Sequence, residues 1–295
     1  MSVELAVTTP AFLDLTFVGL ESLPGPGEER YAGDLVRSPG GGAITAIAAA
    51  RLGLRTALLA PLGNDFAGDF VKREVEAEGV EVAGFRADRT PQTVVMPVGA
   101  EHSMVTVDTG VRARAADVAR LAPVALAANL DQLDLLTGDM HAYLTCGDDD
   151  ARAYARRPPA GLAGARAMFL TEPHALLLTG VGSLQAAAEQ LGEWVETLMI
   201  CDSSQGALAM SNGRRVDLPQ FDTGPAVDST GTRDLLCAAY AWADLRGAAP
   251  DERIAWAQLY SQLAITVPTA TRGALTEERL LAEGLARGLT RPARP

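Results

Sequence analysis

The chain has few cysteines and no long uninterrupted apolar segment. Its three cysteines, Cys146, Cys201 and Cys237, are odd in number and widely spaced, which argues against a disulfide framework and a zinc motif. No apolar run reaches the roughly 18 residues of a membrane span, and the nearest, AFLDLTFVGL, is interrupted by Asp14 and Thr16. The start, MSVELAVTTP, lacks the basic and apolar regions of a signal peptide. These absences predict a cytoplasmic protein without a membrane partner.

Positive charge is also scarce. The chain has 25 lysine and arginine residues against 37 aspartate and glutamate residues, which gives a formal net charge of −12. A protein that binds nucleic acid broadly needs the opposite balance, so we expect no nucleic-acid partner. Any polyanionic substrate would need a local positive site. What the chain does have is length and apolar content, because 295 residues, 48% of them hydrophobic, suffice for one large α/β domain.

Helical and strand-like segments alternate in the first part of the chain. A glycine turn near residue 40 precedes an Ala-rich helix that ends at Gly53, and the buried strand RTALLAPLG follows. Asp65 is placed to cap the next helix, which ends at Gly79 and leads into the strand VEVAGF. Helices and strands joined by short links predict a parallel sheet with helices packed on its faces.

The same alternation returns after residue 165. RAMFLTE and TLMICD are typical of buried strands, and the helical segment GSLQAAAEQLGEWVE lies between them. GALAMSNGRRVDLP predicts a hairpin that turns at Asn212 and Gly213. Two further helices, TRDLLCAAYAWADLRG, which ends at Gly247, and DERIAWAQLYSQLAITV, follow it.

Three regions depart from this order. Residues 20–39 are rich in proline, glycine and charge, and residues 90–110 alternate like a two-stranded ribbon, so both could project from the main sheet. Residues 111–165 are Ala-rich and helical at first, and then contain the acidic run 148–150, which we interpret as a solvated loop. Neither a repeat nor a low-complexity linker divides the chain, so we expect a single domain over residues 1–295.

The segment most informative about chemistry is residues 228–234, Asp-Ser-Thr-Gly-Thr-Arg-Asp, directly ahead of an apolar helix. A helix N-terminus offers free N–H groups and the positive end of the dipole, so it binds anions. Gly231 would let the backbone approach a phosphate closely. Asp234, in the first turn, could accept a proton from an attacking hydroxyl group. The same residue types also cap helices, so a simply capped helix is the alternative reading of this segment.

This segment resembles the Asp-Thr-x-Gly-Ala-Gly-Asp signature of ribokinase-like, PfkB-type carbohydrate kinases. Other stretches resemble the family's motifs in the same order, over about 80% of the chain. They are LPGPGEER (start of the lid), GGGAITAIAAARLG (Gly-Gly turn and helix), LGNDFAGDFVKREVEAEGV (Gly-x-Asp-x-x-Gly), LTEPHALLLTG (Asn-x-x-Glu), and the nucleotide-side loops SQGALAMSNG and ITVPTATRGA.

The resemblance implies a three-layer α/β/α sandwich with a small β-sheet lid, formed by segments at about residues 17–38 and 90–110. It also implies roles for individual residues. The expected site comprises Asp234 as catalytic base; Gly231, Thr232 and Arg233 as anion hole; Asp14, Gly40, Gly41 and Thr45 for substrate; Ser203, Gly206 and Gly273 for nucleotide; and Asp228 and Thr230 beside a monovalent cation.

Four departures from the family pattern affect mainly the phosphate and metal side. Arg233 replaces the second glycine of the anion hole, where its cation either meets an anionic ligand or points to solvent or into the phosphate pocket. Thr171 and His174 stand where the family's Asn-x-x-Glu helps to organise Mg²⁺, so His174 is either a ligand or simply a satisfied loop histidine. The loop at 203–206 keeps only its last glycine. The family's substrate asparagine is missing near Thr45.

Residues 111–165 also lack the family's Gly-x-x-x-Asp-x-Asn strand, which predicts a shortened sheet. With the expected base, Asp234, retained, the resemblance implies an ATP-dependent phosphotransferase acting on a primary hydroxyl of a sugar or nucleoside. It would use ATP with Mg²⁺, and K⁺ as the monovalent ion. Some family members pair through their lids, which implies a homodimer. The alternative is a non-catalytic ribokinase-like homologue that binds a small molecule.

Overall fold

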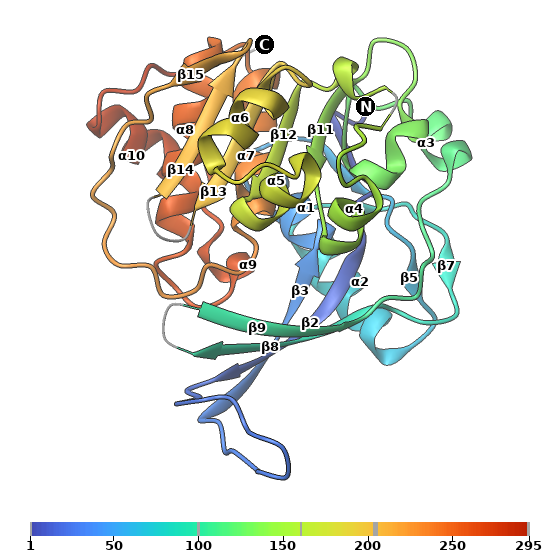
Figure 1. The fold of residues 1–295 in the computed structure, drawn as a ribbon. Coiled ribbons are helices and arrows are strands. Elements are labelled where there is room, and N and C mark those ends of the chain that lie inside the picture. The colour runs from blue at the N-terminus through green and yellow to red at the C-terminus, as the bar shows by residue number, and fades with distance from the viewer. Residues whose placement is uncertain (1, 99–100, 160, 203–205, 294–295) are drawn as a thin grey trace.

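The computed structural model describes residues 2–98, 101–159, 161–202 and 206–293. Its largest element is a nine-stranded sheet with the order β15-β14-β13-β12-β11-β10-β1-β4-β6 (Figure 1). The seven strands from β13 to β6 are parallel, and β14 and β15 add an antiparallel edge. The strands are β1 Leu5–Val7, β4 Thr56–Leu58, β6 Glu81–Val82, β10 Ala125–Asn129, β11 His141–Thr145, β12 Ala167–Thr171, β13 Thr197–Asp202, β14 Gly206–Ser211 and β15 Arg214–Val216.

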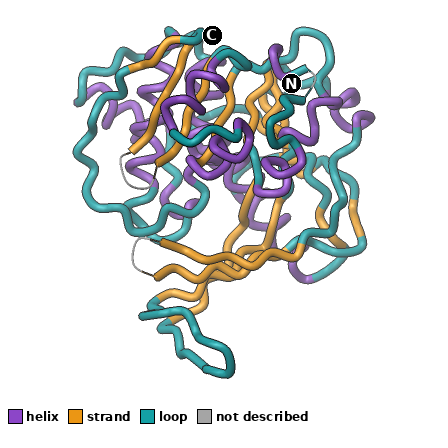
Figure 2. The backbone as a smooth tube through the Cα atoms, in the orientation of Figure 1, coloured by secondary structure: helices purple, strands orange, loops and turns teal. Residues whose placement is uncertain are grey.

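Helices cover both faces of this sheet, as Figure 2 shows. Alternate residues of a strand point to opposite faces, so β1 sends Leu5 and Val7 into one hydrophobic cluster and Ala6 into another. The described helices are α1 Gly42–Arg51, α2 Phe66–Ala77, α7 Thr232–Leu245, α8 Pro250–Ala264, α9 Ala270–Gly273 and α10 Glu277–Ala286 beside the first cluster, and α3 Ala115–Leu121, α4 Asp148–Ala153, α5 Glu172–Thr179 and α6 Leu184–Gly192 beside the second. The expected three-layer sandwich is confirmed.

Local sequence signals place most helix ends correctly. Asp65 caps α2 by accepting a hydrogen bond from the N–H of Gly68 at 2.8 Å. Gly53, Gly79 and Gly247 follow α1, α2 and α7 with positive φ, the conformation in which glycine avoids a steric penalty. None of the described helices has both the length and the apolar character needed to cross a lipid bilayer.

A second sheet of four strands, β3-β2-β8-β9, lies at one end of the sandwich (Figure 1). We call it the lid sheet. A further small pair joins β5 Leu62–Gly63 to β7 Arg86–Ala87. The lid strands are β2 Ala11–Val18, β3 Asp34–Gly41, β8 Gln92–Val98 and β9 Glu101–Val107.

Two expectations for the region between residues 111 and 165 are wrong. The sheet is not shortened there, because β10 and β11 occupy its centre, between β1 and β12. β10 reads ALAAN, and its first four residues are buried, so it has neither the alternation nor the β-branched residues that identify a strand. The acidic run is not a loop either. It begins α4, and Asp150 is buried with one carboxylate oxygen accepting the N–H of Gly147.

Candidate active site

The N-terminus of α7 has backbone N–H groups that no carbonyl of the described residues uses. Gly231 has φ 76°, and a Cβ there would come within 2.8 Å of Ile44 and Ala270, so only glycine fits. The first helical hydrogen bond runs from the N–H of Leu235 to the carbonyl of Gly231. Within the described residues, the N–H groups of Gly231 and Arg233 have no carbonyl partner. This helix end therefore has the unused donors of an anion site.

Asp234 lies in this first turn and is held by Thr45 of α1. The Thr45 hydroxyl is completely buried and donates a hydrogen bond of 3.0 Å to Oδ1 of Asp234. Burial raises the pKa of Asp234 to about 6, although the positive charge of Arg233 and the Thr45 hydrogen bond oppose the rise. A carboxylate with such a pKa is ionised at neutral pH and more basic than usual, which suits a general base.

Asp14 supplies a second carboxylate, from strand β2 of the lid sheet. Its side chain is buried, at 7% exposure, and among the described residues it has no hydrogen-bond partner. Burial, followed by the negative charges of Asp234 and Asp228, raises its pKa to about 7. Gly40 lies against it, since a Cβ there would be 2.2 Å from the carboxylate. A buried, unpartnered carboxylate next to Asp234 is suited to bind a hydroxyl group.

The lid sheet turns a polar row toward α7. Asp14 is in register with Thr93 of β8, and Thr93 with Thr106 of β9, whose hydroxyl lies 3.1 Å from that of Thr93. His102 lies on the same face of β9, and its Nδ1 is 3.5 Å from the hydroxyl of Ser229 in the loop before α7. The sequence analysis missed Thr93, Thr106 and His102, although their period-two spacing was the available signal.

The remaining turn residue, Gly41, has φ 56° and precedes α1. A Cβ at Gly41 would lie 2.5 Å from both the Phe12 ring and the Pro10 carbonyl. The Gly40–Gly41 pair is thus required for the lid strand to pass directly into the helix that carries Thr45.

Asp228 joins two loops beside the anion site. Its carboxylate accepts hydrogen bonds of 2.9 Å from the backbone N–H groups of Thr230 and Thr269. The hydroxyl oxygens of both threonines are buried and have no partner among the described residues. Thr269 has φ 63°, which is costly for a β-branched residue. Orphaned hydroxyl oxygens next to a carboxylate are suitable ligands for a monovalent cation.

Arg233 reaches across the site instead of pointing away from it. Its Nη1 donates to the carbonyl of Cys146, just beyond β11, and lies 3.4 Å from Nδ1 of His174 in α5. His174 is buried and also contacts Thr171 at 2.9 Å through Nδ1 and Asp148 at 2.7 Å through Nε2. Burial and the charge of Arg233 lower the pKa of His174, so the imidazole is neutral at pH 7.

This arrangement does not fit a protein-held Mg²⁺ at Thr171 and His174. Mg²⁺ requires oxygen ligands in octahedral geometry, whereas both nitrogens of His174 are engaged and a guanidinium lies beside it. No group of three or more histidine, cysteine or acidic side chains suited to a metal is found within the described ranges. The sequence analysis left His174 as a ligand or a satisfied loop histidine; it is satisfied, but buried in a helix.

Three residues expected on the nucleotide side remain predictions. Ser203 lies outside the described residues. Gly206 begins β14 opposite Asp202, at the end of the sheet where the parallel strands finish. Gly273 closes α9, and a Cβ there would be 1.9 Å from the carbonyl oxygen of Ala264, so its backbone is tightly packed.

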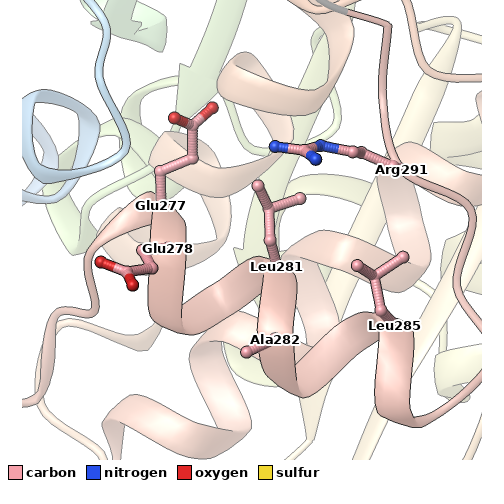
Figure 3. A pocket seen from close by; sticks show the side chains of 6 residues that line it. All are labelled: Glu277, Glu278, Leu281, Ala282, Leu285 and Arg291. Carbon is pink, nitrogen blue, oxygen red and sulfur yellow. The ribbon is translucent and has the colours of Figure 1, made fainter.

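Two other hollows lie outside this group of residues. One, of about 440 Å³, is lined by α10 and the C-terminal segment (Figure 3). Figure 3 shows two carboxylates, Glu277 and Glu278, against one arginine, Arg291, a balance that disfavours a polyphosphate. The other, of about 530 Å³, includes Leu15 and Val94, on the lid face opposite Asp14.

Comparisons with known proteins relate both sequence and fold to sugar kinases. The model of the pfkB family carbohydrate kinases matches residues 12–277. A search of curated proteins found no match. The solved ribokinase of Thermotoga maritima is similar, with a TM-score of 0.78 and 17% identity, covering 95% of this chain and 98% of its own.

Two liganded ribokinases are similar to the same degree. That of Cryptococcus neoformans var. grubii serotype A, in complex with ADP, has a TM-score of 0.77 and 18% identity over 96% of this chain and 99% of its own. That of Arabidopsis thaliana, complexed with ribose and ATP, has a TM-score of 0.77 and 20% identity over 96% of this chain and 98% of its own. At these identities the likeness establishes the fold.

Proposed function

The chain belongs to the pfkB family of carbohydrate kinases, and we propose that it transfers the γ-phosphoryl group of ATP to a primary hydroxyl of a sugar or nucleoside, with Asp234 as general base. The observation that carries this proposal is the meeting of three features: the unused N–H groups of α7, the basic carboxylate of Asp234 and the unpartnered carboxylate of Asp14. Separately, each feature has a structural explanation; together they match the needs of phosphoryl transfer.

The chemical step follows from these positions. Asp14 binds a hydroxyl of the acceptor, and Asp234 accepts the proton of the hydroxyl that attacks the γ-phosphorus. As the new oxygen–phosphorus bond forms, the bond from the γ-phosphorus to the β–γ bridging oxygen breaks, and ADP leaves with the electron pair. The N–H groups of Gly231 and Arg233 stabilise the charge on the transferred group.

Thr45 is expected to position Asp234. The sequence assigned it to substrate binding, but its hydroxyl is completely buried and bonded to Asp234. The polar lid row of Thr93, Thr106 and His102 offers hydroxyl and imidazole groups for the acceptor instead.

We further propose that Asp228, Thr230 and Thr269 bind K⁺, which would satisfy the two orphaned hydroxyl oxygens. A bound cation would fix the loop before α7, and so the N–H groups. Turnover measured in KCl should exceed that in tetramethylammonium chloride of equal ionic strength. Equal turnover in the two salts would contradict the proposed K⁺ site.

A homodimer through the lid is part of the same proposal. The outer lid face exposes Val105 and Val107, at 61% and 56%, over the hollow that contains Leu15. Sedimentation should give a mass near twice 30.8 kDa, and Val105→Glu should shift it to the monomer. A monomeric parent protein would contradict this part alone.

A substrate screen tests the enzymatic proposal against the non-catalytic alternative. Sugars and nucleosides are offered with ATP, and ADP release is measured, while a thermal-shift titration with ATP and ADP measures binding. A substrate that releases ADP well above the ATPase background would support the kinase. Saturable nucleotide binding without turnover of any acceptor, or no binding at millimolar nucleotide, would favour the alternative.

A further inference from the structure

The guanidinium of Arg233 has no counterion among the described side chains of this strongly acidic protein. No carboxylate lies within ion-pair distance of it among the side chains that the structure describes, which do not include that of Asp202, although the chain carries a net charge of −12. Its place in the first turn of α7 is also unfavourable, because the positive end of the helix dipole opposes a cation there. An anion at this helix end would neutralise the charge of Arg233 and would also interact favourably with the positive end of the helix dipole.

The guanidinium is anchored along one side only. Its two contacts, with the Cys146 carbonyl and Nδ1 of His174, both involve Nη1. Nε and Nη2 have no partner among the side chains that the structure describes, and Arg233 as a whole is half-buried. The Nε–Nη2 edge presents two parallel N–H groups, the geometry that binds two phosphate oxygens at once.

His174 holds this arrangement in place through its tautomer. Asp148 accepts the Nε2–H of His174, which leaves Nδ1 as an acceptor for the Thr171 hydroxyl and for Arg233. The imidazole is therefore a fixed hydrogen-bond acceptor, and neither nitrogen is free for a metal. In the family's motif, this position helps to organise Mg²⁺. In this chain, the residue at the same position orients an arginine.

We propose that Arg233 is the phosphate-binding cation of this site and takes over the charge neutralisation that a protein-organised divalent ion would supply there. The inference rests on the proposed function, since it assumes a polyphosphate donor at α7. His174, Thr171 and Asp148 are positioning residues: Thr171 and Asp148 orient His174, and His174 holds the guanidinium through Nη1, which leaves the Nε–Nη2 edge for a ligand.

Metal-free binding of a polyphosphate tests this proposal. ATP, ADP and inorganic tripolyphosphate are titrated calorimetrically into the full chain, first in EDTA and then with Mg²⁺. The parent protein should bind ATP and tripolyphosphate in EDTA, and Mg²⁺ should tighten binding by less than about tenfold. Arg233→Gln should weaken metal-free binding by about 10- to 100-fold, the range expected for charged hydrogen bonds.

Two further variants separate phosphate binding from a structural role. Arg214→Gln removes one positive charge from an exposed position on β15 and should bind as the parent does. Arg233→Lys keeps a cation and a donor for the Cys146 carbonyl but loses the paired edge, so its metal-free affinity should be intermediate. Melting curves establish that each variant is folded. A folded Arg233→Lys keeps the test valid if Arg233→Gln does not fold.

The outcomes are distinct. Parent binding that requires Mg²⁺, with an Arg233 variant binding as well as or better than the parent, would overturn the role of Arg233 and leave the kinase proposal intact. In that case Arg233 would have a structural role, linking α7 to the residues that follow β11 and to α5. No binding of ATP or tripolyphosphate by the parent under either condition would overturn both proposals.

Discussion

Helix α7 carries an aspartate near each end, half-buried in the first turn and buried in the last, and the two differ in their surroundings. Asp234, in the first turn, has one side-chain hydrogen bond, from Thr45. Asp244, in the last turn, is 1% exposed and is surrounded by cations and donors. Tyr143 donates to it at 2.7 Å, and nitrogens of Arg166 and Arg253 lie 3.1 and 2.9 Å from its oxygens.

The pKa values of these two carboxyl groups move in opposite directions. Burial alone would raise the pKa of Asp244, but hydrogen bonds from Arg166 and Tyr143 and the charge of Arg253 lower it. The effect of burial on Asp234 is opposed by the charge of Arg233 and by hydrogen bonds from Thr45 and from the backbone of Asp234 itself, and its pKa still rises to about 6. A fully paired buried carboxylate stabilises its surroundings, whereas an under-paired one is available for reaction.

The largest expected effect tests the functional end of α7. Asp234→Asn should lower kcat by about 10²- to 10⁴-fold, since the amide cannot accept the proton. The folded pKa of Asp234 is raised above its ordinary value of 3.8, so its stabilising contribution is present below that value and lost as pH rises through about 6. Asp234→Asn should therefore be more stable than the parent at pH 7, by at most about 3 kcal/mol. Urea unfolding and kcat are measured together, and an unchanged kcat removes Asp234 from the mechanism.

The structural end of the helix should behave in the opposite way. Asp244→Asn leaves Arg166 and Arg253 without their shared partner, which should cost about 3–5 kcal/mol of unfolding free energy. Because the folded pKa of Asp244 is lowered, the parent protein loses this contribution as pH falls below the ordinary aspartate value of 3.8. Urea unfolding at pH 7 measures the loss, and kcat per folded molecule should stay near the parent value. An Asp244→Asn variant with the unfolding free energy of the parent would contradict the structural role assigned to this end of α7.

The pH dependence of catalysis sharpens the comparison. A base with a pKa of about 6 should make kcat fall about tenfold per pH unit below that value. Asp14, with a pKa of about 7, should add a second inflection to kcat/KM, and Asp14→Asn should remove it. A profile that stays flat down to pH 5 would show that neither carboxylate titrates in the catalytic step.

The smallest effect concerns the side-chain hydrogen bond that Asp234 receives from Thr45. Thr45→Val keeps the buried shape but removes the donor to Oδ1, so kcat should drop about tenfold. The hydrogen bond favours the charged carboxylate, and its loss should move the acid limb of kcat to higher pH. Thr45→Ser, which restores the hydroxyl, is the control. A drop in kcat without a shift of the acid limb of the pH profile would indicate that the substitution changed only packing.

Where the sequence analysis succeeded, the signal was local. Asp65 as a cap, the glycines after the helices, and the Asn212–Gly213 turn depend on a few neighbouring residues. The order of motifs indicated the family and placed the residues around Asp234. Strand β10 was missed because alanine favours a helix, and only burial between two helical layers makes ALAAN a strand.

By itself, then, the sequence determined the layers and the helix ends, because these follow from hydrophobic period and backbone geometry, and it indicated where a candidate anion site would lie. The tertiary structure alone decided what the polar groups do. Arg233 meets Cys146 across 87 residues and His174 meets Asp148 across 26, and no local rule pairs them. Propensity acts between neighbours in sequence, while hydrogen bonds and pKa values depend on the groups that packing brings together.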